Sequence, residues 1–342
     1  MRNLKAALLK EIGEPLRVES VSEPKLGPND VLVKIRACGL CHSDLHLING
    51  ALRLGKLPIV LGHEAAGVVT EVGKEVSEFV NGDDVVIYFY ISCGKCRYCK
   101  AGYENLCEKV KRIGMDVDGA FAEYVSVPES SLVKLPHKVE ITEAALLGCA
   151  VGTAYHSLVE IGALRMGESV AIFGVGGIGM SAVQVAKLCG AKILAVDIVE
   201  EKLKLAHRLG ADFTINAKEE DPLQRIKELT DGKGADLCLE CIGLPITIEQ
   251  AIKSVKKKGR SVLVGFSTKK VSIDFNELIL RESSVRGSRG LRKQNLIDLV
   301  GLLKEGKLDL KPLITHSYSL EEVNKGFDTL RKGLAIRILL KP

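Results

Sequence analysis

A glycine-rich turn between a strand and a helix constrains the fold of this chain more than any other feature. It covers residues 174–179, after the apolar run Ser169–Phe173 and before a segment whose apolar residues recur every three or four positions. Glycines in that place let backbone amides approach a pyrophosphate at the helix N-terminus. We therefore predict contacts to a dinucleotide from Gly174, Gly176, Gly177, Ile178 and Gly179.

Further apolar runs at 193–197, 236–241 and 261–265 alternate with helical patterns. This alternation predicts an α/β fold with a doubly wound parallel sheet over residues 151–285. Asp197 ends the second predicted strand, where a carboxylate accepts hydrogen bonds from the ribose hydroxyls of adenosine. Because that carboxylate would repel a 2′-phosphate, we expect NAD rather than NADP.

The remainder of the chain has a different texture. Residues 1–150 contain short valine-bearing segments such as Val31–Ala37 and Val68–Val72, which indicate an irregular β-rich domain. After residue 286, helix-like patterns at 296–303 and 320–330 precede a strand-like segment at 336–340. We therefore predict that the 151–285 domain is inserted into a β-rich domain made of residues 1–150 and 286–342.

Charge and composition restrict the classes of molecule that this protein is expected to bind. The 342 residues include 48 basic and 43 acidic side chains, and the densest basic run, Lys256–Lys258, is expected at a solvated helix end. We expect no nucleic-acid or membrane partner. The sequence lacks a signal-like apolar stretch, which favours the cytoplasm. Because thiols stay reduced there, the ten cysteines favour metal binding over disulfides.

Four cysteines lie close together at residues 93, 96, 99 and 107. Four thiolates at this spacing predict one closed tetrahedral zinc site of the structural type, with Cys93, Cys96, Cys99 and Cys107 as ligands. The same motif also fits a zinc ribbon that binds nucleic acid, but the balanced charge and the dinucleotide motif argue against that alternative.

Cys41, His63 and Cys149 are scattered, and each alone is more typical of a buried thiol or a satisfied histidine. Together with the motifs at 93–107 and 174–179, however, their segments resemble the zinc-containing medium-chain alcohol dehydrogenases, in order and over essentially the whole chain. The resemblance implies a chaperonin-10-like (GroES-like) catalytic domain around a Rossmann domain. It also implies two zinc ions per chain and NAD.

The resemblance further implies roles for individual residues. Cys41, His63 and Cys149 would hold a catalytic zinc, with Asp44 orienting His63 and Glu64 behind the metal. Ser43 would take the proton as a zinc alkoxide forms and pass it through the nicotinamide ribose to His46. The other cofactor contacts would be His42 and Arg337 at the pyrophosphate, Lys202 at a ribose and Thr153 beside the nicotinamide. Ordinary surface positions for His42, Lys202 and Arg337 are the simpler alternatives.

The implied activity is NAD-linked interconversion of primary or secondary alcohols with aldehydes or ketones by hydride transfer. Related enzymes that oxidise polyols, sugars or L-threonine are the main alternative; Cys149 as third ligand and the aromatic pair Phe89 and Tyr90 favour simple alcohols. A non-zinc quinone reductase is disfavoured because all ligand positions are filled. A catalytically silent nucleotide-binding regulator is disfavoured because Ser43 is present. The resemblance also implies a homotetramer, with a dimer as alternative.

Overall fold

The computed structural model describes residues 3–333 and 335–342 and separates the chain into two compact units. The first unit comprises Met1–Gly152 with Leu291–Pro342, and the second comprises Thr153–Gly290. The sequence placed the second boundary after residue 285, which lies inside strand β16 (Ser284–Gly287). The structure moves this boundary to Gly290, because all four residues of β16 pair with a strand of the second unit.

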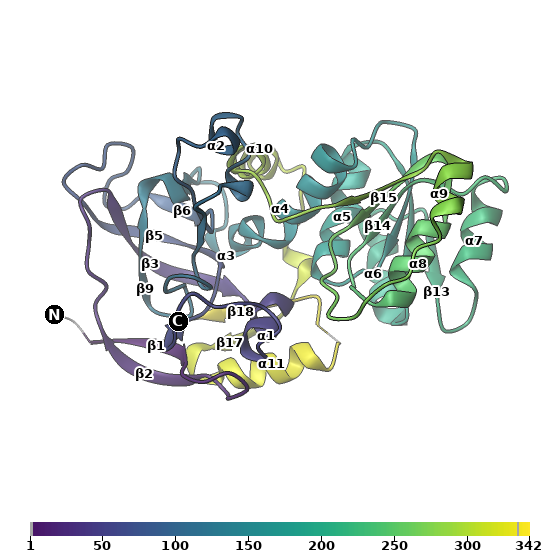
Figure 1. Ribbon diagram of the computed structural model, residues 1–342. Coiled ribbons are helices and arrows are strands. Elements are labelled where there is room, and N and C mark those ends of the chain that lie inside the picture. Colours follow the sequence, from purple (N-terminus) through teal and green to yellow (C-terminus); the bar gives the residue numbers. More distant parts are fainter. Residues whose placement is uncertain (1–2, 334) are drawn as a thin grey trace. The chain divides into compact units, whose positions relative to one another are not determined.

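The first unit is built on a seven-stranded sheet of order β10-β6-β5-β3-β18-β17, with β9 also paired to β3 (Figure 1). Strand β3 (Asp30–Gly39) shows why the sequence forms a sheet. Val33 and Ile35 are buried, whereas Lys34 and Arg36 are exposed. Alternation with a period of two places every second side chain in the core.

The other strands of this sheet are β5 (Glu64–Val72), β6 (Asp84–Ile87), β9 (Tyr124–Pro128), β10 (Leu132–Lys134), β17 (Ile314–Ser319) and β18 (Arg337–Lys341). Two smaller sheets contain β1 (Asn3–Leu9), β2 (Arg17–Ser22) and β4 (Ile59–Val60), and β7 (Tyr90–Ile91) with β8 (Lys111–Arg112). The α-helices wholly in this unit are α1 (His42–Ile48), α2 (Arg97–Lys100), α3 (Ile141–Ala144), α10 (Lys293–Lys304) and α11 (Val323–Arg331). Short 3₁₀ turns are η1 (Glu104–Leu106), η2 (Glu129–Ser131), η3 (Ala145–Gly148), η5 (Lys311–Leu313) and η6 (Leu320–Glu322).

Strand register brings three distant segments together at the end of β3. Gly39, the last residue of β3, lies opposite Glu64 at the start of β5 and opposite Leu339 of β18. The next amide, that of Leu40, donates to the carbonyl of Ile338 at 2.9 Å. The residues just after β3, just before β5 and at the start of β18 therefore meet at one place.

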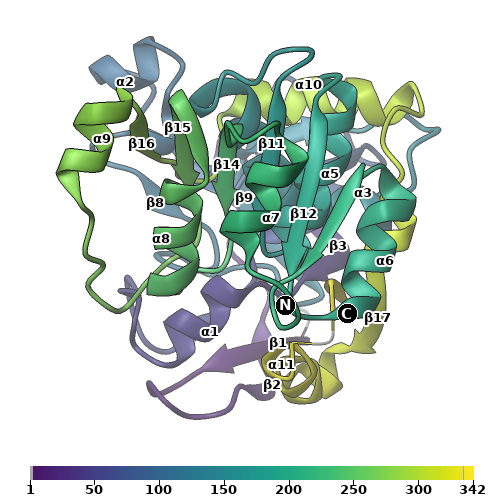
Figure 2. The ribbon, with the colours of Figure 1, turned by 90° about the vertical axis from the view of Figure 1, so that its right-hand side faces the viewer.

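The second unit is a six-stranded parallel sheet of order β13-β12-β11-β14-β15-β16 (Figure 2). Successive strands run outward from β11 to β13, and the chain then returns to the other side of β11 to add β14. This reversal is the place where doubly wound sheets bind ligands. Helices α5 and α6 contact each other, as do α7 and α8, in agreement with helix layers on both sheet faces.

The strands of the second unit are β11 (Ser169–Phe173), β12 (Lys192–Asp197), β13 (Phe213–Asn216), β14 (Ala235–Glu240), β15 (Val255–Leu263) and β16. The α-helices are α5 (Gly177–Leu188), α6 (Glu200–Leu209), α7 (Pro222–Leu229), α8 (Pro245–Lys253) and α9 (Phe275–Arg281). A helix that starts in the first unit, α4 (Ala150–Tyr155), leads into the π-helical turn η4 (His156–Ile161). The β-rich and α/β zones predicted from the sequence are both present.

The lysine run was misplaced by the sequence analysis. Residues 256–258 lie in β15 and not at a helix end. The ladder between β14 and β15 jumps from the pair Ala235–Val255 to the pair Leu237–Arg260, so the intervening residues form a bulge. The Lys256 ammonium also forms an ion pair with Asp236 of β14. The bulge and the ion pair with Asp236 explain how this lysine run can lie within a strand, which the sequence pattern did not predict.

Within the described part of the chain, no single helix has both the length and the apolar character needed to cross a bilayer. Two consecutive helical pieces, Ile141–Gly148 and Ala150–Ile161, reach that length and composition only when taken together, across a 44° bend.

Candidate active site and metal centres

Cys41, His63 and Cys149 form a buried cluster in the first unit. One ligand atom from each lies within 4.8 Å of the others, and the sulfur atoms of Cys41 and Cys149 are 4.0 Å apart. Cys41 follows β3 as the N-cap of α1, His63 directly precedes β5, and Cys149 follows η3. Two thiols and one imidazole suit zinc, and three protein ligands match a catalytic zinc site with one open position. The donor set therefore fits the metal.

Asp44 holds the histidine of this cluster. Its carboxylate is fully buried, with Oδ1 3.2 Å from Nδ1 of His63 and Oδ2 accepting a hydrogen bond from the Cys41 amide at 2.9 Å. Burial lowers the pKa of His63, but the charges and side-chain interactions of Asp44 and Cys41 together outweigh burial and raise the pKa to about 10. Because Asp44 faces Nδ1, the other ring nitrogen, Nε2, is left for a metal.

Glu64 and Arg337 form a second buried pair beside the cluster. Oε1 of Glu64 accepts from the Ala150 amide at 2.8 Å, and Oε2 lies 3.5 Å from Nη1 of Arg337. Burial raises the pKa of Glu64 to about 7 against the opposing charge of Arg337. A Cβ on Gly39 would lie 2.1 Å from Oε2, so this close approach requires glycine.

Arg337 itself does not occupy an exposed position on the edge of the sheet. The side chain is 4% exposed and donates to the carbonyl of Leu40 at 3.3 Å. This burial excludes the surface alternative weighed from the sequence, and the predicted pyrophosphate contact stays a prediction. In the described structure its charge faces Glu64 and the two thiols.

The electrostatics of the cluster favour a thiolate at Cys41. A hydrogen bond from the Cys149 thiol holds the pKa of Cys41 well below its usual range. Burial raises this pKa, whereas the charges of His63 and Arg337 lower it further. The pKa of Cys149 is raised by the same hydrogen bond and by burial. A cation among these donors would relieve the repulsion between two thiolates.

Three predicted relay and cofactor residues lie together on α1. The hydroxyl oxygen of Ser43 is 3.4 Å from Nε2 of His63, the ring nitrogen that faces the cluster. His46 follows one turn later and is half-buried, and His42 is exposed. Residues three apart share a helical face, so Ser43 and His46 lie on one side of α1.

An aromatic pair borders the cluster. The ring of Phe89 meets the ring of His63 edge to face, with centroids 5.2 Å apart, and Tyr90 packs on Phe89 at 4.1 Å. Both aromatic side chains are buried. The sequence analysis expected an apolar aromatic wall here, and Phe89 supplies one directly against the histidine.

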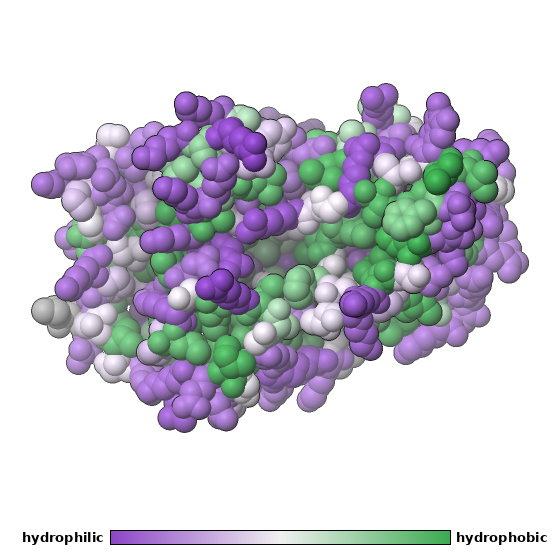
Figure 3. Space-filling model, viewed as in Figure 1, coloured by the Kyte–Doolittle hydropathy of each residue, from purple (hydrophilic) through white to green (hydrophobic). Residues whose placement is uncertain are grey.

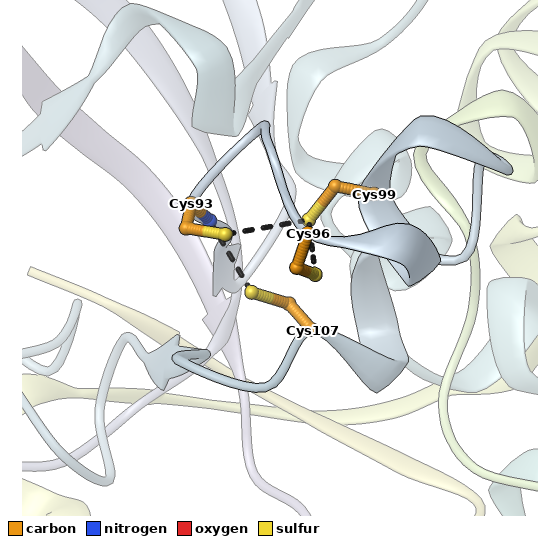
Figure 4. Close-up of side chains that lie close together, drawn as sticks. All are labelled: Cys93, Cys96, Cys99 and Cys107. Atoms are coloured by element: carbon orange, nitrogen blue, oxygen red, sulfur yellow. Dashed lines mark hydrogen bonds between the residues drawn. The ribbon is translucent and has the colours of Figure 1, made fainter.

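The second cysteine cluster is local in sequence. Figure 4 shows the sulfur atoms of Cys93, Cys96, Cys99 and Cys107 pointing toward one another. They lie within 4.8 Å of one another, with 3.5 Å between Cys96 and Cys99. Backbone amides of Cys99 and Glu108 lower the pKa of Cys96 to about 6. Four converging thiols without a further open position fit a structural zinc.

The glycine-rich turn of the second unit has the predicted form. Gly174 has φ of +87°, and a Cβ on Gly179 would lie 1.9 Å from the Gly174 carbonyl oxygen. Helix α5 begins at Gly177, with Gly176 as its N-cap and Ile178 half-exposed in the first turn. The unsatisfied amides of this helix end are available to an anion.

Asp197 lies beside this turn at the end of β12. Its Oδ2 accepts from the Val175 amide at 2.9 Å, and its Oδ1 accepts from the amides of Ile198 and Val199. These bonds fix a half-exposed carboxylate next to the glycine turn. In the described structure, the other predicted cofactor residues of this unit, half-buried Lys202 on α6 and buried Thr153 on α4, form no side-chain hydrogen bond or ion pair with Asp197.

The sequence analysis missed two features. It did not foresee that Gly39 admits the Glu64 carboxylate, because the contact joins residues of two strands. It also overlooked Glu240, a fully buried acid at the end of β14. An acidic residue directly after the apolar run Leu237–Leu239 was the available signal.

Known proteins resemble both units. A family model described as "Alcohol dehydrogenase GroES-like domain" matches residues 27–137, and one described as "Zinc-binding dehydrogenase" matches residues 177–305. The predicted fold class is thereby confirmed. An alcohol dehydrogenase of Geobacillus stearothermophilus is 39% identical, with 99% of each chain covered. An L-threonine 3-dehydrogenase of Bacillus licheniformis is 37% identical over 99% of each, and a sorbitol dehydrogenase of Halalkalibacterium halodurans is 36% identical over 95% of each.

Solved structures give the same picture. The alcohol dehydrogenase of Aeropyrum pernix has a TM-score of 0.93 at 36% identity, covering 99% of this chain and 100% of its own. A zinc-binding dehydrogenase of Sinorhizobium meliloti, solved with bound NADP, has a TM-score of 0.94 at 31% identity, with 100% of both chains covered.

Proposed function

The chain belongs to the zinc-containing medium-chain alcohol dehydrogenase family, and from this premise we propose that it oxidises simple primary and secondary alcohols with NAD. Membership makes it an oxidoreductase of the zinc-dependent dehydrogenases. The relatives named for alcohols, L-threonine and sorbitol share this chemistry and differ in substrate.

The buried cluster of Cys41, His63 and Cys149 is the observation that carries the proposal. These three residues would hold a zinc ion and leave one position for the substrate oxygen. When bound, zinc acts as a Lewis acid that makes the alcohol proton easier to lose, and the nicotinamide accepts the hydride. The four cysteines of residues 93–107 would hold a second zinc with a structural role.

The chain's own residues would handle the proton. The Ser43 hydroxyl lies beside the cluster, 3.4 Å from Nε2 of His63. We assign to its Oγ the acceptance of the alcohol proton. His46, on the same face of α1 and half-buried, would deliver that proton to solvent as a general base and acid.

The preference for NAD rests on Asp197. Its carboxylate is fixed by three backbone amides beside the glycine turn and keeps part of its surface exposed. A negative charge held there accepts hydrogen bonds from ribose hydroxyls and repels a 2′-phosphate. The Sinorhizobium meliloti relative binds NADP, so the two cofactors must be compared directly for this chain.

L-threonine or polyol oxidation is the second candidate, because a relative named for threonine is only two percentage points less identical than one named for alcohols. Two features favour simple alcohols. Cys149 supplies a sulfur ligand, and Phe89 places an apolar ring against His63. An apolar wall offers no partner for the additional polar groups of threonine or a polyol.

We also propose a homotetramer in the cytoplasm. Helix α9 exposes Phe275, Ile279 and Leu280 by 71, 70 and 80%, and apolar surface gathers over that part of the second unit (Figure 3). Neighbouring β16 is the edge strand of the sheet. A cytoplasmic location agrees with ten free cysteines. Light scattering coupled to size-exclusion chromatography measures the assembly, with a dimer as the alternative outcome.

The deciding experiment is reduction of NAD, and separately of NADP, by the zinc-replete protein. The substrates are a series of primary and secondary alcohols, sorbitol and L-threonine. We expect the highest kcat/KM with simple alcohols and with NAD. Turnover confined to sorbitol or threonine would transfer the enzyme to the second candidate function. Absence of turnover with every substrate, at two zinc ions per chain, would contradict both candidates.

A further inference from the structure

Glu240 is a buried acid that the proposed reaction does not use. It is the last residue of β14, and its side chain is 0% exposed. One oxygen, Oε1, accepts three hydrogen bonds: from the amides of Ile242 and Gly243 at 2.9 and 2.8 Å, and from the Thr247 hydroxyl at 2.8 Å. The other oxygen, Oε2, has no hydrogen-bond partner among the described residues.

Two loops close around this carboxylate. The backbone carbonyl of Glu240 accepts from the amides of Val264 and Gly265 at 2.9 and 3.1 Å. A Cβ on Gly265 would lie 2.5 Å from Oε2 and 2.1 Å from the amide nitrogen of Gly243. A Cβ on Gly243, whose φ is +86°, would lie 2.4 Å from the Phe266 carbonyl. The backbones of loops 241–244 and 264–266 are therefore closely packed against each other. The Glu240 carboxylate lies beside both loops.

Loop 241–244 also packs against the glycine-rich turn of residues 174–179. A Cβ on Gly174 would lie 2.4 Å from a side-chain carbon of Ile242, and the Cys241 amide donates to the Phe173 carbonyl at 3.0 Å. Because β14 is the neighbour of β11 at the reversal of strand order, this contact is at the ligand-binding edge of the sheet.

Asp197 and Glu240 occupy equivalent places on the two sides of β11. Asp197 ends β12, is partly exposed and is suited to meet the adenosine ribose. A dinucleotide spans the reversal, so its nicotinamide half lies toward β14. Glu240 cannot contact that half, because its side chain has no exposed surface. It can act only through the loops that it holds.

These loops present a surface to a ligand. Ile242, Leu244 and Phe266 are 42, 50 and 46% exposed, although the carboxylate below them is buried. Burying an ionisable group lowers stability unless hydrogen bonds compensate, and here one oxygen remains without a partner. An acid at this position is therefore poorly explained by fold stability alone. A carboxylate is, however, a compact acceptor of several hydrogen bonds, which is what holding two ligand-facing loops in place requires.

We infer that Glu240 is a positioning residue for the nicotinamide half of the cofactor: its carboxylate sets loops 241–244 and 264–266 against each other at the carboxyl edge of the sheet. The inference rests on the proposed function in one respect, the binding of NAD. It adds a residue that determines cofactor affinity without touching the cofactor.

The test measures binding rather than turnover. Dissociation constants for NADH and for AMP are determined on the zinc-loaded protein. Binding of NADH is followed by the change in its own fluorescence. AMP probes the adenosine half alone. The variants are Glu240→Gln and Thr247→Val, which removes one hydrogen-bond donor to Glu240.

Asp236→Asn is the matched control. Asp236 lies at the opposite end of the same strand and accepts hydrogen bonds from the amide and hydroxyl of Ser169. Loss of this partly buried carboxylate should lower the melting temperature without altering the carboxyl edge of the sheet. It therefore separates loss of fold stability from loss of loop position.

We expect Glu240→Gln to raise the Kd for NADH about tenfold and Thr247→Val about threefold, with AMP unchanged within about twofold in both. Asp236→Asn should leave both constants unchanged. Equal weakening of NADH and AMP, or no weakening of NADH, would overturn the inference. If Glu240→Gln does not fold, the Thr247→Val result decides. A wild-type protein that binds AMP but not NADH would overturn the proposed function itself, and the inference with it.

Discussion

The two candidate metal sites of the first unit bring similar donor atoms together in different ways. The 93–107 cluster draws four thiols from one short loop, three of them partly exposed, and its supporting hydrogen bonds come from backbone amides. The Cys41–His63–Cys149 cluster draws three donors from three distant segments, all buried.

The supporting groups differ as well. Beside the buried cluster lie three charged side chains that are almost wholly excluded from water: Asp44, Glu64 and Arg337. Near the surface cluster, the comparable charged pair, Arg97 with Glu108, is 76 and 55% exposed. We call the four cysteines of residues 93–107 the closed set, and Cys41, His63 and Cys149 the open set. The comparison indicates that one local loop is enough to hold the closed set together. The open set needs surrounding charged side chains to hold its geometry.

The largest expected effect follows from removing a ligand of the open set. His63→Ala should abolish binding of one zinc and lower kcat/KM by at least about 10³-fold, because Lewis-acid stabilisation contributes several kcal/mol to the transition state. Zinc content and alcohol-dependent NAD reduction are the measurements. The control is Cys38→Ala, which removes a buried thiol outside the cluster. Full activity of His63→Ala at two zinc ions per chain would contradict the ligand assignment.

Removing one cysteine of the closed set should lower the stability of the fold rather than the activity. Cys99→Ser should release the other zinc and lower the melting temperature by at least about 5 °C, because a structural zinc contributes folding free energy. Activity at low temperature should be largely retained per folded molecule. Calorimetry with metal analysis tests this, and an unaltered melting temperature with two zinc ions still bound would refute the structural assignment.

A smaller effect should follow from loosening the support of the open set. Asp44→Asn keeps the size of the side chain but removes the charge next to Nδ1 of His63. Such partners typically contribute 10- to 100-fold to metal affinity or activity, and we expect a loss of about that size. A zinc-chelator competition assay and kcat/KM report it. Loss of less than about threefold in both would show that the buried support is dispensable.

The smallest effect should come from the support of the closed set. Glu108→Gln breaks the exposed ion pair with Arg97, and exposed pairs contribute about 0–1 kcal/mol. We expect the free energy of unfolding to change by less than about 0.5 kcal/mol, with zinc retained. A denaturant titration measures it. A change as large as that of Cys99→Ser would erase the difference between the two clusters.

The surface cluster and the glycine-rich turn were predictable from the sequence because each is local. Four cysteines between residues 93 and 107 can converge only by folding their own loop, and residues 174–179 are followed at once by the helix whose N-terminus they form. The buried cluster was named from a family resemblance, since no spacing in the sequence relates residue 41 to residues 63 and 149.

Other features depended on packing that periodicity does not encode. The placement of Lys256 in β15 depends on a bulge and on Asp236 of the neighbouring strand. The burial of Arg337 depends on Glu64, and the contact of Glu64 with Gly39 depends on the register between β3 and β5.

The sequence by itself therefore determined the two kinds of domain, the glycine-rich turn and the cluster of four cysteines. Short-range geometry suffices for each, because neighbouring residues in the chain must be neighbours in space. Only the tertiary structure decided which charges surround Cys41, His63 and Cys149, and how Glu240 joins two loops. Those contacts arise where strand ends meet, and strand register is fixed by the burial of whole sheet faces rather than by any local motif.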